Sequence, residues 1–138
     1  MNVWDAVRTK RAIRKFAARP IPPMDLERIV RAGTRAHSSK NQQRWAFVVV
    51  EDGEHLEALS KVGPYAGHIA GAAAAVALVT PDPLGPDQPL SVVWDVGGAA
   101  AQMMLVAWEL GIGSCPATVY EQAMAKDLLG YPDRMWCE

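Results

Sequence analysis

A basic stretch near the start of the chain, residues 10–15, is the first segment whose side chains suggest chemistry. It reads Lys10-Arg11-Ala12-Ile13-Arg14-Lys15. On a helix end Lys10 and Arg14 would share a face, because residues four apart are neighbours there. Converging guanidinium and ammonium groups bind phosphate, since the planar fork of arginine matches phosphate oxygens. Taken alone, such a run is more often a solvated basic surface, so both interpretations stay open.

A polar loop is the second such segment and directly precedes an apolar run, residues 46–50. It reads His37-Ser38-Ser39-Lys40-Asn41-Gln42-Gln43-Arg44-Trp45. Its hydroxyl and carboxamide groups present donors and acceptors together, which suits the edge of a heterocyclic ring. The alternative is an ordinary hydrophilic loop with local side-chain-to-backbone hydrogen bonds.

The bulk properties predict one folded domain. The chain has 138 residues, of which 50% are hydrophobic and 21% charged, so it can build a core and is not expected to be disordered. A net charge of −1 gives no overall affinity for nucleic acid or anionic membranes. Two cysteines, Cys115 and Cys137, form no close pair and no metal-ligand pattern. Reduced thiols are the simplest interpretation, and a single disulfide stays open.

No segment predicts export or membrane insertion. The N-terminus lacks a basic start followed by an apolar stretch, as a signal peptide would have. The apolar segment 70–79 is too short to span a bilayer, and the segment 92–110 carries Asp95, Gln102 and Glu109. We therefore expect a soluble, cytoplasmic protein.

The hydrophobic pattern predicts an α+β chain, because helices and strands follow one another without regular alternation. Proline and glycine clusters separate the elements, most clearly over residues 81–89. Helices are expected at residues 2–10, 25–36, 54–62, 91–110 and 121–129. Strands are expected at residues 45–50, 72–79 and 112–117. In the first helix we expect Val3, Trp4 and Val7 to face the core.

The expected helix 91–110 is apolar nearly all round, so it must be buried nearly all round. A chain of this size has difficulty doing that alone. Gly97 and Gly98 would let a second backbone approach closely. The helix therefore predicts a dimer seam, and a central core helix of a monomer is the alternative.

The order and spacing of these segments resemble the nitroreductase family of FMN oxidoreductases. That family opens with a short helix and an R-R-S-x-R-like element, here Lys10–Arg14. The next helix leads to a P-S-S-x-N-x-Q-P-W loop, here His37–Trp45, and then to a strand. The stretch Asp95–Gly113 resembles the family's central helix and its exit. The resemblance runs from the N-terminus to about Gly130.

The resemblance implies FMN as the cofactor, with NADH or NADPH as a transient electron donor. It places the basic segment on the phosphate and ribityl chain or at the pyrimidine end, the loop against the isoalloxazine, and the stretch after the central helix beside flavin N5. The implied cofactor-binding residues are Lys10, Arg11, Ala12, Arg14, His37, Ser38, Ser39, Asn41, Gln43, Pro116, Ala117 and Thr118. No catalytic side chain and no metal is implied, because the chemistry occurs on the flavin.

Three positions depart from the family pattern. Ala12 replaces a serine, Arg44 replaces a proline, and Val119 stands where some members have glycine. Relatives usually continue past Glu138 with a strand and a tail that embraces the partner subunit. Met135–Glu138 resembles the opening of that strand, so we expect the rest of it to be missing.

The implied protein is a single nitroreductase-like domain, residues 1–138, with a mixed, mainly antiparallel sheet covered by helices. It would form a homodimer through helix 91–110 and pass electrons from NAD(P)H through flavin to a nitroaromatic or quinone-like acceptor. Alternatives are a non-catalytic flavin- or nucleotide-binding module, dehalogenase or dehydrogenase chemistry on the same fold, and a helical subunit whose basic run binds an acidic partner.

Overall fold

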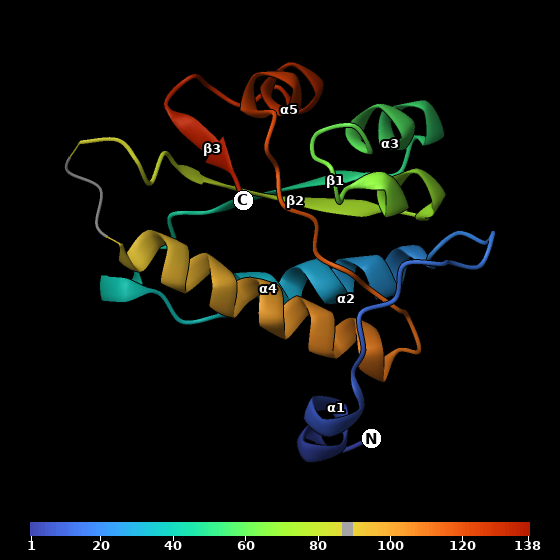
Figure 1. Ribbon diagram of the computed structural model, residues 1–138. Helices are drawn as coiled ribbons and strands as arrows, with labels where there is room; N and C mark the ends of the chain where they lie inside the picture. The colour runs from blue at the N-terminus through green and yellow to red at the C-terminus, as the bar shows by residue number, and fades with distance from the viewer. Residues whose placement is uncertain (87–89) are drawn as a thin grey trace.

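The computed structural model describes residues 1–86 and 90–138. Its centre is a three-stranded sheet in the order β1-β2-β3, built from β1 (Ala46–Val50), β2 (Ala75–Pro81) and β3 (Met135–Cys137) (Figure 1). Both strand pairs are antiparallel. The α+β prediction with a mainly antiparallel sheet is therefore confirmed. The predicted loop 81–89 includes residues 87–89, which lie outside the described residues.

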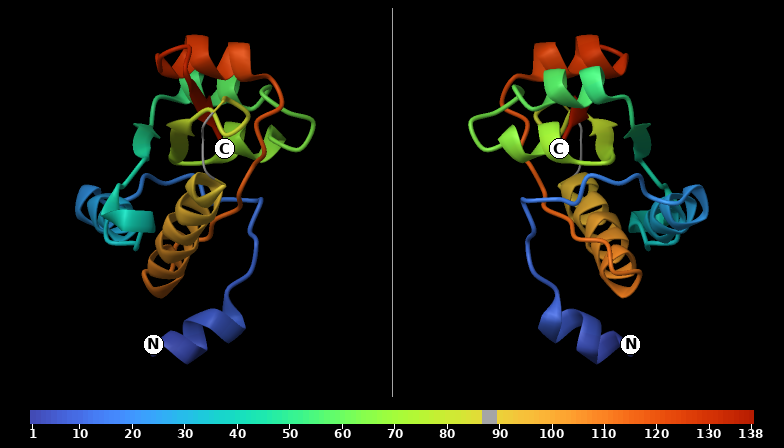
Figure 2. Two further views of the ribbon diagram at one scale, coloured as in Figure 1. Left: turned by 90° about the vertical axis from the view of Figure 1, so that its left-hand side faces the viewer. Right: turned by 90° about the vertical axis from the view of Figure 1, so that its right-hand side faces the viewer.

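The side chains of β2 alternate between the two faces of the sheet, as expected of a strand buried on both sides. Ala75, Ala77 and Val79 belong to one hydrophobic cluster, and Val76 and Leu78 to another. The first cluster lies under the helices α3 (Gly53–Leu59) and α5 (Gln122–Leu129), and the second lies against α2 (Pro23–Thr34) and α4 (Ser91–Glu109). The two turned views show the helices in layers on both sides of the sheet (Figure 2).

The helices α2 and α4 pack directly on each other beneath the sheet (Figure 1). A Cβ on Gly33 of α2 would lie 2.9 Å from the sulfur of Met103, so a larger residue there would require the flexible Met103 side chain to shift. The predicted end of the long helix is confirmed, because Gly111 follows it with a φ of +76°, a conformation that favours glycine. No helix among the described residues is both long and apolar enough to cross a membrane.

The first helix, α1 (Val3–Thr9), stands apart from the rest of the fold (Figure 1). The prediction that Val3, Trp4 and Val7 face the core is wrong, since they are 78%, 70% and 52% exposed. Ala6 is the buried residue of α1, and Thr9 accepts a hydrogen bond of 3.0 Å from the indole of Trp108 on α4. The helix thus touches the end of α4 with one face and leaves an apolar face uncovered.

The predicted strand 112–117 is not formed. In its place Ser114 makes one isolated parallel bridge with Ala12. Pro116 lacks an N–H for a ladder hydrogen bond, which prevents the bridge from growing into a strand. The stretch passes from the end of α4 to α5 as an irregular chain (Figure 1).

Candidate functional site

The basic stretch 10–15 is extended rather than helical. Helix α1 ends at Thr9, and Lys10 has φ −53° and ψ 136°. The prediction that Lys10 and Arg14 share a helix face is therefore wrong, because the helix stops before either residue. In an extended chain alternate side chains share a side, so Lys10, Ala12 and Arg14 fall together and Ile13 and Lys15 fall opposite.

Arg11 is turned back towards α1. Its Nη1 donates to the carbonyl of Arg8 at 3.1 Å and to the carbonyl of Lys10 at 2.9 Å. Among the described residues neither Lys10 nor Arg14 forms an ion pair. The positive charges of Lys10 and Arg14 are therefore not neutralised by carboxylates of that part of the chain, which suits an anionic ligand.

The basic stretch is held against the chain that leaves α4. The N–H of Ile13 donates to the carbonyl of Ser114 at 3.0 Å. A Cβ on Gly113 would lie 2.8 Å from the Cβ of Ile13, so the two backbones touch. The structure therefore places the backbone of Ala12 and Ile13 beside that of Gly113 and Ser114, a few positions before the predicted residues Pro116, Ala117 and Thr118.

The irregular stretch 115–118 offers backbone donors. Among residues 1–86 and 90–138, nothing accepts a hydrogen bond from the N–H of Ala117 or Thr118. By contrast the carbonyl of Cys115 accepts from His68, whose Nε2 lies 3.3 Å away. Unpaired N–H groups are uncommon in folded chains unless water or a ligand accepts from them. These two amides are therefore candidate donors to a bound acceptor atom.

The polar loop 37–45 is anchored at the other end of α4. Ser39 donates to the carboxylate of Asp95 twice, from its N–H to Oδ2 at 2.9 Å and from its Oγ to Oδ1 at 3.3 Å. Asp95 lies in the first half of α4 and is buried. A buried carboxylate requires such partners, because its desolvation is otherwise costly. His37, which was predicted to contact the cofactor, is exposed at the start of this loop.

The same loop holds three residues in the left-handed region. Lys40, Asn41 and Gln43 have φ values of 54°, 54° and 50°. The N–H of Gln43 donates to the Oγ of Ser38 at 2.9 Å, and its carboxamide donates to Asn41 at 2.8 Å. Non-glycine residues in this region are strained, and such strain is concentrated at functional sites. The short helix Ser39–Asn41 that carries two of them is consistent with a binding loop.

The two halves of the predicted site do not meet within one chain. The loop is tied to Asp95 near the start of α4, whereas Ile13 is tied to Ser114 beyond its end. The 19 residues of α4 extend over about 28 Å at 1.5 Å per residue. One copy of the chain therefore presents two half-sites at opposite ends of its longest helix.

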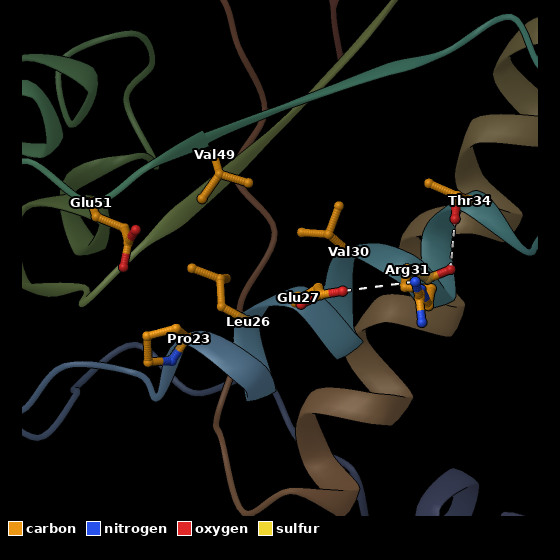
Figure 3. Close-up of a pocket in the computed structure, with 8 residues that line it drawn as sticks. All are labelled: Pro23, Leu26, Glu27, Val30, Arg31, Thr34, Val49 and Glu51. Atoms are coloured by element: carbon orange, nitrogen blue, oxygen red, sulfur yellow. Dashed lines mark hydrogen bonds and ion pairs between the residues drawn. The ribbon is translucent and has the colours of Figure 1, made fainter.

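Two hollows accompany these elements. A cavity of about 630 Å³ lies between the sheet, α4 and the stretches 13–21 and 111–119, and it is lined by Ile13, His68, Met103 and Ala117 among others. A second hollow, of about 460 Å³, lies between α2 and β1 (Figure 3). It is lined by Leu26, Val30 and Val49 with a Glu27–Arg31 ion pair of 3.8 Å at its side. The predicted cofactor residues Pro116, Ala117 and Thr118 line the larger hollow only.

From the sequence, neither Asp95 nor His68 was assigned a role in binding the cofactor. Asp95 carried a signal, because a single carboxylate within an otherwise apolar helical turn needs a partner. His68 carried none, since its partner is a backbone carbonyl 47 positions away. Among the described residues no group of three or more His, Cys, Asp or Glu side chains is placed to hold a metal ion.

The shifted pKa values lie where α5 meets β3, and two of these groups, Cys137 and Glu138, also line the larger cavity. Burial raises the pKa of Cys137 to about 11, with a smaller contribution from the charge of Glu138. Burial, and then the charge of Cys137, raises the pKa of Tyr131 to about 12. Burial also raises the pKa of Glu138. These shifts report on packing rather than on a reacting group.

Comparison with known proteins shows which family the chain is similar to. The sequence model described as the nitroreductase family matches residues 7–79 and 63–137. A curated protein of Archaeoglobus fulgidus, provisionally named NADH dehydrogenase/NAD(P)H nitroreductase, is 36% identical over 132 residues, which cover 92% of this chain and 75% of that protein. A protein of the same provisional name from Methanothermobacter thermautotrophicus is 32% identical, and the match covers 87% of this chain and 62% of that protein.

A solved structure supports the same placement. An FMN-dependent nitroreductase of Clostridium difficile superimposes with a TM-score of 0.84 at 26% identity, covering 98% of this chain and 82% of that one. The present chain is thus shorter than each of these three relatives. The match to the family model, the 36% identity to the A. fulgidus protein and the shared α+β fold all indicate the same family. The chain belongs to the nitroreductase family.

Proposed function

We propose that the protein is an FMN-dependent oxidoreductase that passes electrons from NADH or NADPH to an organic acceptor such as a nitroaromatic or a quinone. The observation that carries this proposal is the bond from the N–H of Ile13 to the carbonyl of Ser114. It joins a basic stretch suited to a phosphate to a stretch in which the N–H groups of Ala117 and Thr118 have no acceptor among the described residues. The C. difficile relative is named FMN-dependent, and the two curated relatives are named for NAD(P)H, in agreement with the proposal.

The residues present fit FMN in charge and in donors. Lys10 and Arg14, which form no ion pair among the described residues, would hold the phosphate. The N–H groups of Ala117 and Thr118 would donate to the ring near N5. Ala12 contributes no hydroxyl, so at that position only the backbone is available. Bound FMN would supply hydride and electron transfer, and the protein contributes position and electrostatics.

The loop 38–43 would complete the site from a second copy of the chain. Along α4 it is separated from the end of the helix by about 21 Å, the rise from Asp95 to Glu109 at 1.5 Å per residue. In a twofold dimer whose α4 helices run antiparallel, the start of one α4 lies beside the end of the other, so each of two sites takes one half from each copy. Ser38, Ser39, Asn41 and Gln43 would then face the ring bound by the partner's basic stretch.

An apolar face of α4 supports this dimer. Val93 and Trp94 are exposed large hydrophobic residues, and Gly97 and Ala101 continue the same face at helical spacing. No atom of residues 1–86 or 90–138 lies within 4 Å of a Cβ built on Gly97, so a second backbone has room to approach. The exposed Trp4 and Val7 of α1 add apolar surface beside the end of α4. Contiguous apolar surface of this kind is typical of an interface.

The test of this function is steady-state oxidation of NADH and NADPH by the purified protein supplied with FMN, with a nitroarene and a quinone as acceptors. Turnover that requires both FMN and an acceptor is expected. Bound FMN without turnover would instead favour the non-catalytic flavin-binding module. The dimer is tested separately, by sedimentation equilibrium with and without FMN.

A further inference from the structure

His68 is placed to act on the amides that face the proposed flavin. It lies in the short helix η2 (Gly67–Gly71), between α3 and β2, and is half-buried. Its Nε2 is 3.3 Å from the carbonyl oxygen of Cys115, and both residues line the larger cavity. Because a carbonyl only accepts, Nε2 carries the hydrogen, which fixes the tautomer of the neutral ring.

The stretch 115–118 has few other restraints. Before it, the Ser114 carbonyl accepts from Ile13, and after it the N–H groups of Tyr120 and Glu121 donate to the carbonyl of Val62 at 2.8 and 2.9 Å. Among the described residues, His68 is the one side chain of another segment that bonds to residues 115–118, while Gln122 of α5 donates to the carbonyl of Val119 at 3.4 Å. A Cβ on Gly63 would lie 2.6 Å from the carbonyl oxygen of Thr118, so the loop that contains Val62 and Gly63 also confines the C-terminal end of the stretch.

A second histidine provides a comparison within the same fold. His55 of α3 also bonds a distant carbonyl, since its Nε2 lies 2.5 Å from the oxygen of Leu128 on α5. Leu128 lies in α5, and although it and Ala117 pack against the same hydrophobic cluster, the bond from His55 does not touch the stretch 115–118. The two histidines thus make the same kind of bond, and only that of His68 reaches the stretch with unpaired amides.

We infer that His68 is a positioning residue: by holding the Cys115 carbonyl it orients the N–H groups of Ala117 and Thr118 towards the flavin. This inference rests on the proposed function for its redox consequence. Donors placed beside a ring that gains negative charge on reduction stabilise the reduced form. Loss of the His68 bond therefore shifts the flavin midpoint potential to a more negative value. In protein without flavin, the same loss loosens the chain around Cys115.

The experiment compares His68→Leu, His68→Gln and the control His55→Leu with the wild type. The first readout is the rate at which a disulfide reagent modifies Cys115 in flavin-free protein. Peptide mass distinguishes this thiol from the second free thiol, that of the buried Cys137. The second is the midpoint potential of bound FMN. His68→Leu is expected to raise the thiol rate severalfold and to make the potential more negative. His68→Gln, which retains an N–H donor, is expected to restore both, and His55→Leu to change neither.

The outcomes separate the two proposals. Equal thiol rates in His68→Leu and the wild type overturn the positioning role, and so do equal shifts of the potential in His68→Leu and His55→Leu. A protein that takes up no FMN overturns the proposed function, while the thiol rates and the glutamine rescue still decide whether His68 holds the stretch. If His68→Leu fails to fold, His68→Gln is compared with Gly113→Ala, which pushes the chain before Cys115 away from Ile13. A midpoint potential that is equally more negative in these two variants counts against the positioning role of His68.

Discussion

Ser39 and Asp95, 56 positions apart in sequence, are joined by two hydrogen bonds that tie the polar loop to α4. Removing the carboxylate in Asp95→Ala leaves a part-buried N–H and hydroxyl without an acceptor. We expect a loss of about 1–3 kcal/mol in the free energy of unfolding. Urea unfolding of the full chain measures it. Gln102→Ala, an exposed change on the same helix, is the control, and an equal loss in both variants would contradict the anchoring role of Asp95.

The contact between Gly113 and Ile13 provides a second prediction. A methyl group at position 113 would lie 2.8 Å from the Cβ of Ile13, so Gly113→Ala must push the two backbones apart. Overpacking of this kind costs about 1–3 kcal/mol, and the displacement also weakens FMN binding. The control is Gly53→Ala, since nothing lies within 4 Å of a Cβ there. Both quantities are measured, by urea unfolding and by FMN titration, and unchanged FMN affinity in Gly113→Ala would count against the paired half-site.

The elements that position the site follow from local signals, and the sequence predicts them well. Gly111 and Gly130 end their helices with φ values of +76° and +75°, a role that glycine fills better than other residues. The strands near 46–50 and 75–81 follow from apolar runs bounded by turn residues. The charge and the polar groups of the candidate site were likewise evident from residue type.

Long-range contacts account for what the sequence did not predict. The extended form of residues 10–15 depends on pairing with Ser114, about a hundred positions away, and local helical spacing between Lys10 and Arg14 carries no information about it. The separation of the loop from the basic stretch depends on which end of α4 each one binds. Trp4 is exposed because no other described residue of the chain covers it.

Complementation tests whether each site takes residues from two copies. Arg14→Ala damages one half-site and Asn41→Ala the other, so each variant alone forms dimers with two defective sites. When the two are unfolded, mixed equally and refolded, half of the dimers are mixed, and each mixed dimer has one site free of both changes. Recovery of about a quarter of wild-type FMN binding is expected. No recovery, with mixed dimers shown to be present by mass, would contradict the shared site.

The buried pair at the α5–β3 junction predicts loss of stability in alkali. The pKa of Cys137 rises from 9.0 to about 11 on folding, and that of Tyr131 from 10.0 to about 12. Both raised values favour the neutral forms, so their contribution is complete below pH 9. Above pH 9 the unfolded chain loses its protons first, and stability falls until the folded pKa values are reached. For Cys137 alone the fall amounts to about 2–3 kcal/mol.

Cys137→Ala isolates this effect. Urea unfolding at intervals between pH 8 and pH 11 is expected to show a shallower loss of stability in the variant, by roughly one proton, or about 1.4 kcal/mol per pH unit. Tyr131, whose hydroxyl donates to Gln122 Oε1 at 3.0 Å, still contributes in the variant, because burial is the larger cause of its raised pKa. The same slope in the wild type and in the variant would show that burial of the thiol has no such consequence.

The most direct test of the account is FMN titration of the full chain, followed by its flavin spectrum, with Arg14→Ala and Arg28→Ala as the paired variants. Arg28 is a suitable control because it binds Glu109 at the surface, 2.9 Å away and outside both half-sites. We expect one FMN per chain, and we expect Arg14→Ala to raise the dissociation constant about 10- to 150-fold, from the loss of roughly 1.5–3 kcal/mol of phosphate pairing. Arg28→Ala should bind like the wild type. A wild-type chain that binds no FMN, or equal affinity in the two variants, would contradict it.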